Sequence, residues 1–185
     1  MLEPLETIKP KLKQLLQTLA YQEGEFQLAS GQTSSYYINC KPVTLHPWGG
    51  LWVGQLLFSL LASNTGAVGG LTLGADPIVS AVSVVSALMG RPLPALIVRK
   101  QPKGHGTQAW IEGEILPQGT IVAVVEDVVT TGSSAMQAVA KLRSAGYQVQ
   151  QVLAIVDRVQ GGRELFLSQG LEFQALFTIA DLSQA

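Results

Sequence analysis

Charged side chains and cysteines are both scarce in this 185-residue sequence. Charged residues make up 14% of the chain, against about 25% in a typical soluble domain, and the mean hydropathy is positive at +0.29. Cys40 is the only cysteine, which excludes an internal disulfide and favours the cytoplasm. We expect Cys40 to be a buried free thiol rather than a nucleophile. The net charge of −1 gives no reason to expect a nucleic-acid partner.

Long apolar runs and a signal-peptide pattern are also missing. No run reaches the roughly eighteen residues of a membrane span, because the best candidate is broken by Gln55, Ser59, Ser63 and Asn64. The N-terminus does not show the basic-then-apolar order of a secretory signal. We therefore expect no membrane partner.

One long segment is almost without charge. Between Pro42 and Gly90 the only charged side chain is that of Asp76. Such a segment has too little polarity for a monomer to cover all of its faces. The sequence therefore predicts a homodimer.

Apolar runs that suit buried strands alternate with helical patterns along the chain, which predicts an α/β fold with a parallel sheet. Sheet strands are expected at 67–73, 95–98, 121–125, 149–156 and 175–179. Helices are expected at 4–20, 48–62 and 76–89, and a further helix should end at Gly146. Asp76 and Pro77 form a suitable cap and first turn for the third of these helices.

The most informative stretch is Ile121–Ser134. An apolar strand ends there in the carboxylates of Glu126 and Asp127, which only accept hydrogen bonds and therefore match two sugar hydroxyls. A hydroxyl cluster around Gly132 follows, made of Thr130, Thr131, Ser133 and Ser134. The next helix points its free amides at that cluster, as an anion site requires. The stretch predicts a ribose 5-phosphate site; the alternative is an ordinary polar turn, and a Walker-type loop is disfavoured because Gly-Lys-Ser/Thr is absent.

A second stretch, Val98–Thr107, is a basic loop. Its cations and its histidine are Arg99, Lys100, Lys103 and His105. Proline and glycines break regular structure within it. A basic loop of this kind fits a polyanion such as pyrophosphate, and the alternative is a solvated charged loop.

Together these stretches resemble the type I phosphoribosyltransferases. The basic loop is similar to the Arg-Lys-x-x-Lys-x-His-Gly pattern of the orotate phosphoribosyltransferase family. Three more stretches resemble that family in the expected order: a hood segment, the first sheet strand with its turn, and a strand end with an arginine, at Phe26–Asn39, Gly69–Pro77 and Val156–Arg158. The resemblance implies one phosphoribosyltransferase domain over 1–185, with a parallel-sheet Rossmann-like core and a small N-terminal hood formed mainly by about residues 1–45.

The resemblance also implies a reaction and its residues. The 5-phosphoribosyl group would pass from phosphoribosyl diphosphate (PRPP) to orotate, giving orotidine 5′-monophosphate and pyrophosphate in UMP biosynthesis. The implied catalytic residues are Lys100, Lys103, His105 and Asp127. PRPP would be bound by Arg99, Lys100, Lys103, His105, Glu126, Asp127, Val128, Val129, Thr130, Thr131, Gly132, Ser133 and Ser134. Orotate would be bound by Thr130 and Arg158.

Mg²⁺ is the implied cofactor, held mainly through PRPP and pyrophosphate oxygens, with no protein metal ligand assigned. The homodimer would share its basic loop between active sites. The alternative for Arg158 is an ion pair with Asp157 or a surface charge.

Two departures from the family pattern concern the diphosphate. Ala29 stands where many bacterial members have a lysine, and Leu73–Asp76 replaces a turn that often carries a Tyr-Lys pair. These departures keep open a non-catalytic protein that senses PRPP. Transfer to adenine, hypoxanthine or uracil is a separate alternative, because purine enzymes have the same acid-pair loop.

Overall fold

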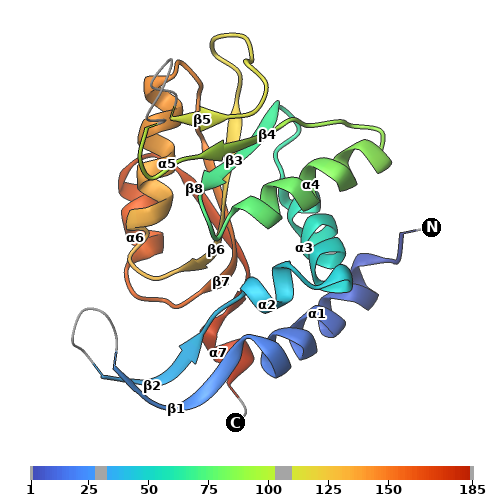
Figure 1. Cartoon of the computed structure of the whole chain (residues 1–185), viewed down its shortest axis with the longest axis vertical. Helices are drawn as coiled ribbons and strands as arrows, with labels where there is room; N and C mark the ends of the chain where they lie inside the picture. The colour runs from blue at the N-terminus through green and yellow to red at the C-terminus, as the bar shows by residue number, and fades with distance from the viewer. Residues whose placement is uncertain (1, 28–32, 103–109, 184–185) are drawn as a thin grey trace.

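The computed structural model of the protein describes residues 2–27, 33–102 and 110–183. Its centre is a six-stranded sheet in the order β5-β4-β3-β6-β7-β8 (Figure 1). Neighbouring strands are parallel except for β4 and β5, which are antiparallel. The strands are β3 (Ala67–Leu71), β4 (Ala95–Val98), β5 (Ile111–Glu112), β6 (Val122–Val129), β7 (Gln151–Asp157) and β8 (Glu172–Thr178). The predicted α/β fold with a mainly parallel sheet is confirmed.

The central strands consist largely of β-branched and aliphatic residues because both of their faces are covered. The prediction for β4 matches its bounds, whereas that for β6 ends too early. The strand does not stop before Glu126 but continues to Val129, because Val128 and Val129 pair with Val156 and Asp157 of β7. The acid pair therefore lies inside a strand rather than after it.

Helices cover both faces of the sheet (Figure 1). One face carries α3 (Pro47–Leu60) and α4 (Asp76–Leu88), and the other carries α5 (Ser133–Ser144) and α6 (Gly162–Ser168). Two hydrophobic clusters correspond to these faces. The first cluster joins α3 and α4 to Ala123 and Val125, and the second joins α5 and α6 to Val122 and Val124. Successive residues of β6 thus alternate between the two sides.

The N-terminal part forms a hood beside the sheet. It contains α1 (Leu5–Leu19), the antiparallel hairpin of β1 (Tyr21–Gln27) and β2 (Thr33–Ile38), and the short helix α2 (Lys41–Thr44). The apolar stripe of α1 is buried in the same cluster as α3 and β7. The C-terminal helix α7 (Ile179–Leu182) also holds α1, because the Gln17 side chain donates to the carbonyl of Leu182. These contacts fix the hood against the strand ends.

Asp76 has a different role from the predicted one. The cap of α4 is Ala75, whose backbone is already helical, and Asp76 is the first residue of the helix. The Oδ2 atom of Asp76 accepts a hydrogen bond from the hydroxyl of Thr72 at 2.8 Å. Asp76 therefore closes the turn that leads from β3 into α4.

Several large apolar side chains remain exposed near the charge-poor segment: Leu45, Trp48, Leu73, Val84, Leu88 and Met89. Among the described residues, no helix has both the length and the apolar character needed to cross a bilayer.

Candidate active site

The candidate site lies at the carboxyl ends of β3 and β6. After β3 the chain moves to β4 on one side, whereas β6, β7 and β8 follow on the other side. Such a reversal of strand order opens a crevice outside the strand ends, where ligands bind in α/β sheets. The turn after β3 closes against β6, since a Cβ atom placed on Gly74 would lie 2.7 Å from Oδ1 of Asp127.

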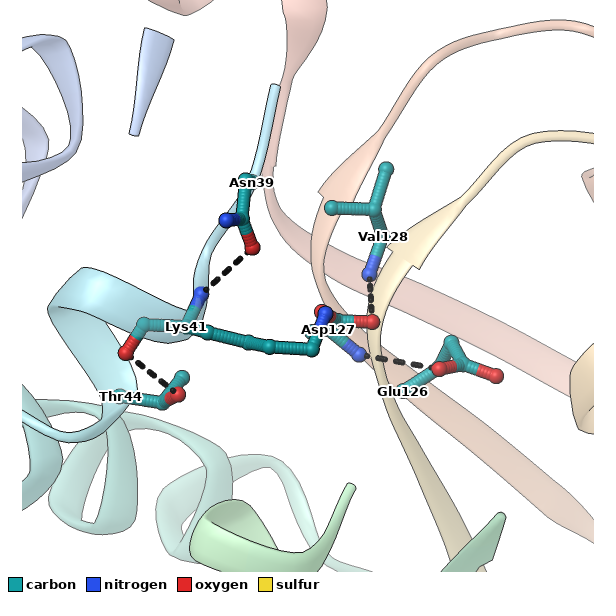
Figure 2. A network of polar contacts seen from close by, with 6 residues as sticks. All are labelled: Asn39, Lys41, Thr44, Glu126, Asp127 and Val128. Atoms are coloured by element: carbon teal, nitrogen blue, oxygen red, sulfur yellow. Dashed lines mark hydrogen bonds and ion pairs between the residues drawn. The ribbon is translucent and has the colours of Figure 1, made fainter. Parts of the chain in front are cut away.

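The two carboxylates of the acid pair face different surroundings. Glu126 lines a hollow at the start of α5 and is only 6% exposed. Asp127 faces the hood, where the Nζ atom of Lys41 lies 3.8 Å from its Oδ2 atom (Figure 2). Adjacent residues of a strand point to opposite faces, so the extension of β6 is what separates them. One carboxylate is thus placed toward the phosphate hollow and the other toward the β3 turn.

Lys41 was not among the predicted site residues. Asn39 orients the start of α2, because its Oδ1 atom accepts from the backbone N–H of Lys41 at 3.2 Å, and the Thr44 hydroxyl donates to the Lys41 carbonyl (Figure 2). The lysine then reaches across to Asp127. This pair is half-exposed on the lysine side, which limits its contribution to less than about 1 kcal/mol. In the sequence, Lys41 is a single cation at the end of the hood, and a single cation is too weak a signal to predict a site residue.

Burial, and after it the charge of Asp127, raises the pKa of Glu126 to about 8. The charge of Lys100 acts in the opposite direction, so this lysine of the basic loop lies close enough to influence Glu126. The buried Oε2 atom of Glu126 has no hydrogen-bond partner among the described residues. An unpaired buried acceptor is costly, and a sugar hydroxyl would supply the missing donor.

The raised pKa predicts a pH-dependent stability. Between pH 4.5 and about 8 the folded protein keeps a proton on Glu126 that the unfolded chain has lost, so stability falls as the pH rises through this range. Glu126→Gln cannot ionise and removes this loss. We expect its free energy of unfolding to exceed that of the unaltered protein by on the order of 2–4 kcal/mol at pH 8.5, and to be similar at pH 5.

Urea unfolding at both pH values measures this difference. Glu164→Gln, which alters an exposed carboxylate of α6, is the matched control and should show no such dependence. A difference for Glu126→Gln that is the same at pH 5 and pH 8.5 would contradict the assignment.

The hollow at the start of α5 has a volume of about 80 Å³. Gly132 adopts a φ of +82° and ends the turn directly before the helix. Because this cap residue has no side chain, the first amides of α5 are left for an anion. The lining residues are Glu126, Val128, Val129, Thr130, Thr131, Gly132, Ser133, Ser134 and Ala135. Of the residues predicted to bind PRPP in the stretch 126–134, all except Asp127 therefore line this one hollow.

The basic loop is described only over residues 98–102, so Lys103 and His105 lie outside the described residues, as does Ala29. Arg99 forms an ion pair with Glu112 of β5, in which its Nη1 atom lies 2.9 Å from the Oε1 atom of the glutamate. Lys100 follows at the end of β4.

Arg158 follows β7 and turns toward the hood. Its Nε atom donates to the hydroxyl of Tyr36 at 3.0 Å, and its guanidinium lies 4.8 Å from the centre of that ring. The predicted alternative of an ion pair with Asp157 is not what the described contacts show, because Asp157 accepts from the backbone N–H of Val159. The Arg158 backbone N–H donates to Val129, which places the arginine beside Thr130. Tyr36 was missed, although it lies in the hood segment that the sequence singled out.

Cys40 is a buried free thiol, as predicted. Burial raises its pKa well above the usual thiol range, and the nearby charge of Asp127 adds to this effect. A thiol in this environment is a poor nucleophile.

The mainly parallel sheet, with helices on both faces and a hollow at its switch point, is the fold of the type I phosphoribosyltransferase class. An orotate phosphoribosyltransferase from a Nostoc species is 63% identical over 180 residues, which cover 97% of this chain and 87% of the relative. One from Synechocystis is 61% identical over 181 residues, covering 98% and 91%. The chain belongs to the orotate phosphoribosyltransferase family.

Solved structures agree with this family membership. The Mycobacterium tuberculosis orotate phosphoribosyltransferase in complex with PRPP superposes with a TM-score of 0.79 at 35% identity, covering 94% of this chain and 98% of that one. A search against family models found no match.

Proposed function

We propose that the protein transfers the 5-phosphoribosyl group of PRPP to N1 of orotate, giving orotidine 5′-monophosphate and pyrophosphate for UMP synthesis. The observation that carries the proposal is the β6–α5 turn, which joins an unpaired buried carboxylate to an anion hollow. Relatives named orotate phosphoribosyltransferase at 63% and 61% identity support it.

The 5-phosphate fits the hollow at the start of α5, where backbone amides and the hydroxyls of Thr130, Thr131, Ser133 and Ser134 would hold it. The ribose hydroxyls would then donate to Glu126 and Asp127. This arrangement leaves C1 of the ribose facing the crevice between the strand ends.

Cleavage of the C1–O bond develops positive charge on the sugar and negative charge on the diphosphate. The charge of Asp127 favours the positive sugar, while Lys100, and by the family pattern Arg99, Lys103 and His105, stabilise the leaving anion. The effect of Lys100 on Glu126 supports its place in this group. The described residues thus supply charge of the required sign on both sides of the breaking bond.

We further propose Mg²⁺ as the cofactor, held mainly by diphosphate oxygens and water. The ligand atoms at the strand ends are carboxylate and hydroxyl oxygens, which Mg²⁺ prefers, and Asp127 is the carboxylate of β6 that approaches the β3 turn at Gly74. The ion would neutralise charge on the diphosphate.

The acceptor needs a cation for its carboxylate, and Arg158 is the proposed partner, with Thr130 beside it. The contact with Tyr36 holds the guanidinium plane in place. Adenine, hypoxanthine and uracil have no carboxylate to pair with this arginine, so orotate is favoured over them.

Incubation with PRPP, Mg²⁺ and each base in turn tests the proposal, with orotate consumption followed by its absorbance. Turnover of orotate alone is the expected result. Turnover of another base would keep the use of PRPP and overturn the role of Arg158. A lack of turnover together with PRPP-dependent thermal stabilisation would favour a sensor of PRPP instead.

We also propose that the protein is a homodimer in which Lys103 and His105 of the basic loop of one subunit serve the active site of the other, while Lys100 stays at the acid pair of its own subunit. Large apolar side chains near α3 and α4 are exposed to water. Because exposed apolar patches often mark protein–protein interfaces, they support a surface for self-association.

A mixing experiment tests the shared loop. Lys103→Ala removes a cation of the shared part of the loop and Asp127→Asn alters the acid pair, so each homodimer should be nearly inactive. A mixed dimer would regain one site with both groups intact, and about a quarter of the full activity is expected for random pairing. Absorbance assays after subunit exchange measure this, and activity no higher than the sum of the parents argues against sharing.

A further inference from the structure

Lys141 connects the helix that starts at the phosphate hollow with the start of the basic loop and with Trp110, which follows the loop. It lies on α5, about 12 Å along the helix axis from Ser133. Its Nζ atom donates to the carbonyl oxygen of Arg99 at 2.7 Å and to that of Lys100 at 3.3 Å. The same atom lies 4.2 Å from the ring centre of Trp110, the first described residue after the loop.

Other contacts also fasten the loop base, within the β4–β5 hairpin and to the end of β3, where the backbone N–H of Thr72 donates to the carbonyl of Val98 at 2.8 Å. The backbone N–H of Arg99 donates to the carbonyl of Trp110 at 2.8 Å, and the Arg99 guanidinium pairs with Glu112. Of the contacts described here, those of Lys141 are the ones that tie this hairpin to α5 through charge-assisted hydrogen bonds and an aromatic ring. Lys141 therefore contributes directly to the position of the Lys100 backbone relative to the hollow.

We propose that Lys141 is a positioning residue for transfer: it fixes the backbone of Lys100 at a set distance from the bound 5-phosphate. This inference rests on the proposed function. Binding of the phosphate end needs only the start of α5, whereas charge stabilisation at the diphosphate needs Lys100 in the correct place. Removing the lysine's donors should therefore affect turnover much more than binding of the phosphate end.

A purely structural role would be to stabilise the last turn of α5, as cations near helix C-termini do. Arg143 offers a matched comparison. It lies in the same turn and its Nη2 atom donates to a backbone carbonyl, that of Val149, at 2.9 Å. That carbonyl belongs to the connection toward β7 and not to the basic loop. Arg143→Met therefore removes a helix-end cation without releasing Lys100.

The experiment compares Lys141→Met, Lys141→Arg and Arg143→Met with the unaltered enzyme. The readouts are kcat, the KM for PRPP and the Kd for ribose 5-phosphate. We expect Lys141→Met to lower kcat about 10- to 100-fold, by misplacing Lys100, and to leave the Kd for ribose 5-phosphate within about twofold. Lys141→Arg should recover much of the loss, because it keeps donors and charge, and Arg143→Met should stay close to the unaltered kcat. A kcat for Lys141→Met equal to that of Arg143→Met, or a parallel loss of ribose 5-phosphate binding, would overturn the proposal.

Hydrogen exchange at the amide of Arg99 separates this inference from the proposed function, because it needs no turnover. That amide is bonded to Trp110 across the loop base. Its exchange should become at least about tenfold faster in Lys141→Met and stay unchanged in Arg143→Met. Unchanged exchange in both variants overturns the role of Lys141 whatever the enzyme assay shows. If exchange becomes faster but the protein transfers phosphoribose to no base, the positioning role of Lys141 stands and the proposed reaction is rejected.

Discussion

Lys100→Ala should lower kcat by about 10²- to 10³-fold, while the affinity for ribose 5-phosphate changes little. The lysine is close enough to Glu126 to oppose the rise of its pKa, so its charge acts at the acid pair. In transfer, that charge would meet the diphosphate as the C1–O bond breaks, when the negative charge is greatest. In the proposed binding mode α5 holds the 5-phosphate without a contribution from Lys100.

Steady-state kinetics with PRPP and orotate, combined with calorimetric titration of ribose 5-phosphate, separates the two effects. Lys9→Ala is a suitable control, since Lys9 is an exposed cation of α1 that lies over the Phe177 ring. Equal losses in turnover and in phosphate binding would show that Lys100 acts as a general binding charge, contrary to the proposed role.

The second large effect is expected for Gly132→Ala. The φ of +82° costs a residue with a side chain about 1–2 kcal/mol. The added Cβ atom would also lie 2.8 Å from Cζ of Phe166, whose ring is fully buried and packed against Phe173. Overpacking of that kind adds about 1–3 kcal/mol. We expect a total loss of about 3 kcal/mol in the free energy of unfolding, together with strongly weakened phosphate binding.

Gly170→Ala separates the two causes. Gly170 also has a positive φ, of +68°, but nothing lies within 4 Å of the position that its Cβ atom would take. This control should lose only about 1 kcal/mol and should bind phosphate normally. Urea unfolding and titration with inorganic phosphate provide the comparison. If the two variants lose the same stability and both still bind phosphate, the contact with Phe166 does not shape the hollow.

The sequence predicts those parts of the site that are formed by consecutive residues. The β6–α5 turn is an example: the apolar run, the hydroxyl cluster and Gly132 are neighbours in the chain, and local geometry brings them around one hollow. The bounds of β4 were also predicted, because an apolar run between a proline and a basic loop leaves little choice.

Features that depend on distant pairing were not predictable in the same way. The apolar run of β6 ends at Val125, but hydrogen bonding to β7 extends the strand to Val129 and turns the two carboxylates to opposite sides. Lys41 reaches Asp127 only because the hood folds back over the strand ends. In the sequence, Lys141 cannot be told apart from any other charged residue on the exposed side of a helix. Its role is visible only from its contacts with the loop carbonyls.

The bond between Tyr36 and Arg158 joins residues 122 positions apart. Tyr36 belongs to β2 of the hood, whereas Arg158 follows a strand of the core. If Arg158 binds the acceptor base, the preference for one base depends on two segments, the hood strand with Tyr36 and the end of β7 with Arg158. Recombination can separate these segments. A chimera that takes its hood from a relative with another residue at position 36 would leave the arginine without its support. To exchange the acceptor preference between two relatives, both segments must therefore be taken from the same parent.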